Sequence, residues 1–179
     1  MLKIILFAFI LYFFTAWVFE GMMNNKLGDL NFIVIKNPAE DLRVTALIDD
    51  LNQSLEVITG ASGSKNAVLT DFEHHRALFV IGLRDENAVA CGGFRPVDRQ
   101  TCEIKRMFSI EKGKGIGGQL LAELERQAGG LGYTTIQLET RRINQGAVNF
   151  YLSNGYQIID NYGIYHGRAE AVCFAKRLC

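Results

Sequence analysis

Four glycines fall within seven residues of this chain, in the run Lys112-Gly113-Lys114-Gly115-Ile116-Gly117-Gly118. Glycine allows a backbone to approach a ligand closely and to take positive φ angles. An amphipathic helix is predicted directly after the run, from Gln119 to about Gly129, and a helix start binds anions through free N–H groups and a positive dipole end. Lys112 and Lys114 add positive charge. The run therefore predicts a phosphate or pyrophosphate site.

The sequence of the glycine run can also be compared with the motifs of two other phosphate-binding loops. Gly113, Gly115 and Gly118 spell G-x-G-x-x-G, and Glu139 follows about twenty residues later, as in dinucleotide-binding loops. However, the predicted strand before the loop, 101–110, is charged and ends an antiparallel meander, whereas a dinucleotide fold starts with an apolar parallel strand. No G-K-[ST] follows, which excludes a Walker loop.

The elements that must position this loop follow a mixed pattern of strands and helices. Strands are expected at 31–36, 77–83, 88–94, 101–110, 133–140, 156–160 and 170–176. Helices are expected at 39–57, 66–75, 119–129 and 144–154. Short turns at 84–87 and 95–100 predict that the three middle strands are antiparallel. The fold class is therefore mixed α/β, of the α+β kind.

Composition narrows the class of protein and its partners. Nineteen basic and nineteen acidic residues leave no net charge, and the absence of a basic run argues against nucleic-acid binding. A length of 179 residues with 49% hydrophobic residues fits one domain with a substantial core. The four cysteines lack C-x-x-C spacing, and His74 and His75 lack a suitably spaced third ligand, so no metal site is predicted.

The first 21 residues form a separate apolar segment, because the run from Ile4 to Phe19 is interrupted only by Thr15. It is near the short limit for a membrane helix. Three interpretations stay open: a membrane anchor, an apolar helix packed on a partner, or a start codon placed too early, with Met22 or Met23 as the true start. The globular domain is expected over residues 30–179. A cytoplasmic location is expected, with membrane anchoring if the apolar segment is genuine.

Two segments together resemble the GNAT family of N-acetyltransferases. The first is EIKRMF at 103–108 followed by the glycine run, where the family signature (Arg or Gln, two residues, Gly, one residue, Gly or Ala) falls on Lys112, Gly115 and Gly117. The second is the segment 138–156, and the resemblance covers about 31–178. Lys112 departs from the usual Arg or Gln, and the loop after Met107 is shorter than usual and lacks proline.

The resemblance implies a mostly antiparallel sheet of about six or seven strands with a central splay, flanked by about four helices. It also implies acetyl-CoA, or another acyl-CoA, as donor, with a small-molecule primary amine as acceptor and a monomer or homodimer as the assembly. An N–H of Phe108 or Ser109 would polarise the thioester carbonyl. The positions that match cofactor-binding residues are Met107, Phe108, Ser109, Lys112, Gly113, Lys114, Gly115, Ile116, Gly117, Gly118, Asn144 and Tyr151.

Two catalytic roles follow from the same resemblance. Tyr151 matches the general acid that protonates the leaving thiolate, and an ordinary half-buried tyrosine is the structural alternative. Glu103 is the preferred candidate for the base that deprotonates the amine, with Glu139 as its rival, and ion pairs are the structural alternative for both. Asn144 matches a cofactor contact or is simply a helix N-cap. A non-catalytic acyl-CoA-binding or sensing module on the same scaffold is the alternative function.

Overall fold

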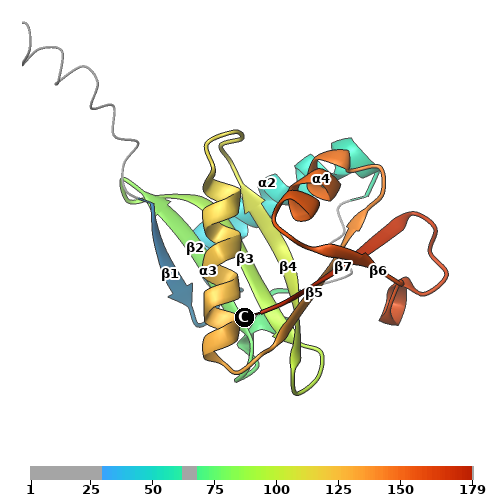
Figure 1. Ribbon diagram of the computed structural model, residues 1–179. Helices are drawn as coiled ribbons and strands as arrows, with labels where there is room; N and C mark the ends of the chain where they lie inside the picture. The colour runs from blue at the N-terminus through green and yellow to red at the C-terminus, as the bar shows by residue number, and fades with distance from the viewer. Residues whose placement is uncertain (1–29, 62–67, 179) are drawn as a thin grey trace, which may run out of the picture.

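A computed structural model describes residues 30–61 and 68–178 of the chain, and the predicted apolar segment at 1–21 lies outside them (Figure 1). The described residues contain a seven-stranded sheet in the order β1-β2-β3-β4-β5-β7-β6. Its strands are β1 (Asn31–Ile35), β2 (Leu78–Arg84), β3 (Asn87–Pro96), β4 (Thr101–Ser109), β5 (Thr135–Arg141), β6 (Gln157–Ile159) and β7 (Ala171–Arg177). Every neighbouring pair is antiparallel except β4 and β5, which are parallel. The predicted mixed, mostly antiparallel architecture is confirmed.

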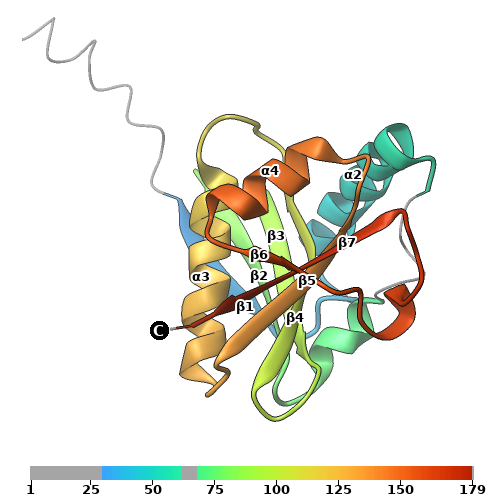
Figure 2. The same cartoon turned by 45° about the vertical axis from the view of Figure 1, so that its right-hand side comes forward.

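The helices lie on both faces of this sheet (Figures 1 and 2). Helix α3 (Ile116–Gly130) packs on one face and α2 (Leu42–Thr59) on the other, each with its own hydrophobic core. Helix α4 (Gln145–Ser153) joins the α3 side through Val148, Phe150 and Tyr151. The described part of the chain thus holds three α-helices rather than about four. None of them is long and apolar enough to cross a membrane.

The helix predicted at 66–75 is not an α-helix: its described residues form only a 3-10 turn, η2 (Leu69–Glu73). A second 3-10 turn, η3 (Gly163–Tyr165), follows β6. Helix α2 begins at Leu42 rather than Ala39, because Asp41 caps it by accepting the Arg43 N–H at 2.9 Å. Leu42, expected on the buried stripe of that helix, is 83% exposed as a result.

The start of α3 also differs from the prediction. The helix begins at Ile116 and not at Gln119, because Gly115 takes a left-handed conformation and serves as its N-cap. Gly117 and Gly118 therefore belong to the first helical turn rather than to the preceding loop. This change brings the positive end of the helix closer to the glycine loop.

The centre of the sheet opens because a bulge interrupts β4. The β3–β4 register shifts between Cys91 and Gly93, so that Arg106 and Met107 on β4 face Gly92 alone, and Arg106 has a φ of 57°. The parallel pairing of β4 with β5 covers only Thr101–Glu103. Beyond it, β5 continues to Arg141 against β7, and β4 continues against β3. The two strands therefore separate, as the predicted central splay requires.

We expect Gly93→Ala to destabilise the protein, since Gly93 lies beside this bulge. An added Cβ would be 2.6 Å from the Leu78 carbonyl oxygen and 2.7 Å from ring atoms of Phe72 and Phe79. Such overpacking lowers the free energy of unfolding by about 1–3 kcal/mol. The control is Gly129→Ala in α3, where a Cβ meets nothing within 4 Å, so that stability stays equal or rises by up to about 1 kcal/mol. Urea denaturation measures both, and equal stabilities would contradict the packing.

Candidate active site

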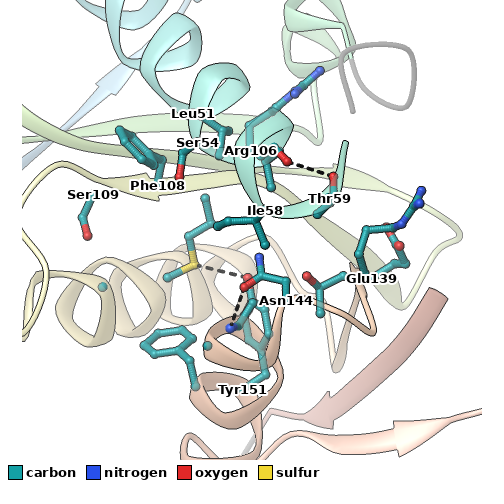
Figure 3. A pocket seen from close by; sticks show the side chains of 18 of the residues that line it. Leu51, Ser54, Ile58, Thr59, Arg106, Phe108, Ser109, Glu139, Asn144 and Tyr151 are labelled. Atoms are coloured by element: carbon teal, nitrogen blue, oxygen red, sulfur yellow. Dashed lines mark hydrogen bonds between the residues drawn. The ribbon is translucent and has the colours of Figure 1, made fainter. Parts of the chain in front are cut away.

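A cavity of about 670 Å³ occupies the opening between β4 and β5. Its walls come from β4, the glycine loop and first turn of α3, the C-terminal half of α2, the start of α4, and the ends of β5 and β7. Figure 3 shows Leu51 and Ile58 of α2 on one side of the cavity and Asn144 and Tyr151 on the other. The splay of the sheet is thus the floor of a pocket large enough for a cofactor arm and a small acceptor.

The glycine loop forms one end of the cavity. Gly113 and Gly115 have φ angles of 71° and 75°, and a Cβ at either would meet nothing within 4 Å, so the backbone is open to a ligand. No side chain caps α3. The first N–H groups of that helix, from Ile116 to Gly118, therefore lack helical partners and can bind an anion. These residues fit the pyrophosphate of a CoA-type ligand.

The two lysines of the loop differ in position. Lys112 lines the cavity, with its Nζ 4.7 Å from the centroid of the Phe108 ring. Both lysines are exposed, but Lys114 does not lie on the cavity wall. Charge beside the loop thus comes from Lys112 within the cavity, although both lysines were predicted to contact the cofactor.

An ion pair that the sequence did not predict anchors the entrance of the loop. Arg84, at the end of β2, donates from Nη1 to both carboxylate oxygens of Glu111, at 2.8 and 2.9 Å. Glu111 directly precedes Lys112 and lines the cavity. The pair connects residues 27 positions apart in the chain, and no local spacing signals such a contact. It holds the short loop between β4 and α3 against the sheet.

Strand β4 supplies the wall next to the splay through Met107, Phe108 and Ser109, three residues predicted to bind the cofactor. The Ile110 N–H bonds the Val89 carbonyl of β3 at 2.9 Å. Because successive N–H groups of a strand point to opposite sides, the Ser109 N–H is directed away from β3, toward the opening. Of the two N–H groups considered from the sequence, the geometry favours that of Ser109.

Helix α4 brings Asn144 and Tyr151 to the same cavity. Asn144 is the N-cap of α4 and accepts the Ala147 N–H at 3.2 Å. It therefore both lines the cavity and caps the helix. The Tyr151 hydroxyl lies 3.9 Å from the Met107 sulfur, across the opening (Figure 3). Burial, and then the charge of Glu139, raises the pKa of Tyr151, which therefore keeps its proton at neutral pH.

The two candidate bases lie in different surroundings. Glu103 is only 4% exposed and does not line the cavity. Its carboxylate contacts Arg95 at 3.0 Å and Lys105 at 3.0 Å, and accepts the Tyr162 hydroxyl at 2.7 Å. Such a buried carboxylate is occupied by its partners, which corresponds to the ion-pair alternative. Arg95 extends the network to Asp71 in η2.

Glu139 lies on the wall of the cavity, on the same face of the sheet as Glu103. Burial raises the pKa of its carboxyl, and the charge of Lys105 is the largest opposing influence. Tyr165 also hydrogen-bonds the carboxylate, while its own hydroxyl accepts a hydrogen bond from Lys105. A partly buried carboxylate that lines a cavity and has a raised pKa suits a general base.

The end of the cavity opposite the glycine loop is polar, and the sequence predicted a binding role for few of its side chains. Its side chains are Arg106, Glu139, Arg141, Tyr165, Arg168 and Glu170. Glu139 was considered in advance as a base, Arg106 and Arg141 only as ion-pair partners of Glu103 and Glu139, and Tyr165 only as part of the segment 162–166 expected near the acceptor. The side chains other than Glu139 come from a bulge, a strand end and the segment between β6 and β7, which the fold brings together from distant parts of the chain.

A metal centre is not evident in the residues that the structure describes. No group of three or more His, Cys, Asp or Glu side chains there could hold a metal ion. The rings of His74 and His75 stack with centroids 4.2 Å apart, and His74 Nδ1 accepts the Arg76 N–H at 3.1 Å. These two histidines form a local turn.

Comparison with known proteins identifies the family. Residues 45–156 match the model of the Acetyltransferase (GNAT) family, which is more than half of the chain, so the chain belongs to this family. Its members are acetyltransferases, and acetyl-CoA is their cofactor, which confirms the predicted family and cofactor. No curated protein is significantly similar to the chain in sequence.

Solved structures share the fold. A putative acyl-CoA N-acyltransferase from Klebsiella pneumoniae has a TM-score of 0.69 and 24% identity, over 84% of this chain and 98% of the other. A GNAT acetyltransferase from Staphylococcus aureus gives 0.67 and 16%, over 84% and 100%. A GNAT acetyltransferase from Elizabethkingia anophelis, solved with acetyl-CoA bound, gives 0.62 and 18%, over 83% and 98%. At these identities the likeness concerns the fold.

We expect Glu103→Gln to destabilise the protein by about 3 kcal/mol or more, because it leaves the buried Lys105 without the carboxylate it contacts. The control is Glu123→Gln, whose partner Arg126 is 67% exposed and whose loss costs less than about 0.5 kcal/mol. Free energies of unfolding from urea titration compare the two. Similar small losses would show that the Glu103 network is not a structural support.

Proposed function

We propose that the protein transfers an acetyl group from acetyl-CoA to the primary amine of a small molecule, by direct attack in a ternary complex. The observation that carries this proposal is the meeting of three features in one cavity: the uncapped start of α3, the splayed edge of β4, and the Tyr151 hydroxyl. Each supplies one requirement of acyl transfer: an anion site, a slot for the cofactor arm and a proton donor.

The residues that would hold the donor follow from this placement. The N–H groups of Ile116 to Gly118 would bind the pyrophosphate, and Met107 to Ser109 with Asn144 would line the cofactor arm. Acetyl-CoA supplies the thioester carbonyl that an amine attacks. The Ser109 N–H is directed to the opening, where a donor to that carbonyl oxygen would stabilise developing negative charge by about 3 kcal/mol.

Proton transfers fall to two side chains of the cavity wall. The amine nitrogen forms the new N–C bond as the C–S bond breaks. We assign the proton lost by the amine to Glu139 rather than Glu103, because Glu139 faces the cavity and Glu103 is held by three partners. Tyr151 gives its proton to the departing sulfur, since burial keeps its hydroxyl protonated.

Direct transfer is favoured over a covalent acyl-enzyme by the state of the cysteines. Cys91, Cys102 and Cys173 are buried, and none of the three lines the cavity. Burial raises the pKa of the Cys91 and Cys102 thiols to about 12, so neither is a thiolate at neutral pH. None of these three cysteines is therefore placed to act as a nucleophile in the cavity.

We expect Tyr151→Phe to lower kcat by at least about tenfold with little change in the KM for acetyl-CoA, because it removes the proton donor alone. The matched control is Tyr156→Phe: this ring packs 5.7 Å from that of Tyr151, but its hydroxyl does not line the cavity. Thiol release from acetyl-CoA with a panel of amines measures both. CoA binding without turnover by the wild type would favour the sensing module, and full turnover by Tyr151→Phe would remove Tyr151 from the mechanism.

The pH dependence distinguishes the two candidate bases. Glu139 must be deprotonated to act, so kcat/KM should rise with pH through its raised pKa. Glu139→Gln should remove this acid limb and lower kcat/KM by about 10²-fold or more. Glu103→Gln, measured at a temperature where it stays folded, should keep the limb. The reverse result, a limb lost only in Glu103→Gln, would return the role of base to Glu103.

A further inference from the structure

Arg141 is a partly buried arginine of the cavity wall whose guanidinium is not fully satisfied by the described residues. It is the last residue of β5, lines the cavity, and follows Glu139 on the same face of the strand. Its Nε is buried without a hydrogen-bond partner, and the structure records no ion pair for it with any described residue. A buried guanidinium N–H without a partner is unfavourable unless a ligand supplies an acceptor.

The charges around Arg141 also favour an anion. Five basic and three acidic side chains of the described residues line the cavity. One of these acids, Glu111, is neutralised by Arg84 at the glycine-loop end. At the opposite end, Arg141 and Arg168 lie with Arg106, which also donates to Asn52 of α2 at 3.2 Å, and these three cations outnumber the carboxylates of Glu139 and Glu170. This end therefore attracts a negative group and repels a polycation.

We propose that the acceptor carries a carboxylate in addition to its amine, an α-amino acid being the simplest case, and that Arg141 binds this carboxylate. The inference rests on the proposed function and names its substrate class. Residues two apart on a strand are separated by about 7 Å. Arg141 and Glu139 can therefore receive the two ends of one small zwitterion, the carboxylate at the guanidinium and the amine at the base.

Side chains already assigned to the cavity account for every proton that this reaction moves. The amine nitrogen of the acceptor bonds to the acetyl carbon, and the C–S bond of the donor breaks. Glu139 takes the proton from nitrogen and Tyr151 gives one to sulfur, so that an N-acetylamino acid and CoA leave. The carboxylate stays bound to Arg141 throughout, which makes Arg141 a specificity residue.

The test compares the common amino acids with their carboxamides as acceptors, with acetyl-CoA saturating. Arg141→Met is the variant. Its control is Arg177→Met, an exposed arginine at the other end of the same β5–β7 pairing. We expect the wild type and Arg177→Met to prefer at least one amino acid over its amide by about tenfold or more in kcat/KM. Arg141→Met should lose this preference through KM, with an unchanged dissociation constant for CoA.

A binding measurement keeps the inference separate from the proposed function. Calorimetric titration of the CoA-loaded protein with N-acetylamino acids and N-acetylamino amides reports the carboxylate site without turnover. Binding of the acids alone, weakened about tenfold by Arg141→Met, supports the inference even if no amine is acetylated. Three results would overturn it: equal binding of acids and amides, better turnover of neutral or polycationic amines, or weaker CoA binding by Arg141→Met, which would assign the anion to the cofactor itself.

Discussion

The short parallel pairing between β4 and β5 is the constraint on which the site depends. The strands are paired only over Thr101–Glu103, and a bulge with Arg106 at a φ of 57° redirects β4 beyond that point. A continuous parallel pair would satisfy the backbone groups of both strands and fill the centre of the sheet. Because the pairing stops, the edge of β4, the first turn of α3 and the start of α4 surround one cavity.

A buried charge network supports the closed end of the splay. Asp71 of η2 contacts Arg95 of β3, which contacts Glu103 of β4, and Lys105 links Glu103 to Tyr165 of η3. Each charge has an opposite partner, as burial requires. The network joins segments that are far apart in the chain and ends beside Glu139, so the polar floor of the site and the position of the proposed base have the same support.

The parts of the site that sequence could predict are those signalled by local pattern. Glycine density and the following helix predicted where the proposed anion site lies. Asn144 and Tyr151 lie at the start of and within one short helix, so their common placement on the cavity wall followed from the resemblance. Predictions failed where local chemistry competes or distant segments meet. The left-handed Gly115 started α3 three residues early, and neither the Arg84–Glu111 pair nor the placement of Arg141 leaves a signal in spacing.

Amide hydrogen exchange with and without acetyl-CoA tests most directly whether the splay and the start of α3 form the cofactor site. We predict slower exchange on binding for the amides of Ser109 and of Ile116 to Gly118, residues that line the cavity. The amides of Thr101–Glu103, already paired with β5, should change little. Unchanged exchange in both cavity segments at saturating acetyl-CoA would show that the splay and the start of α3 do not form the cofactor site.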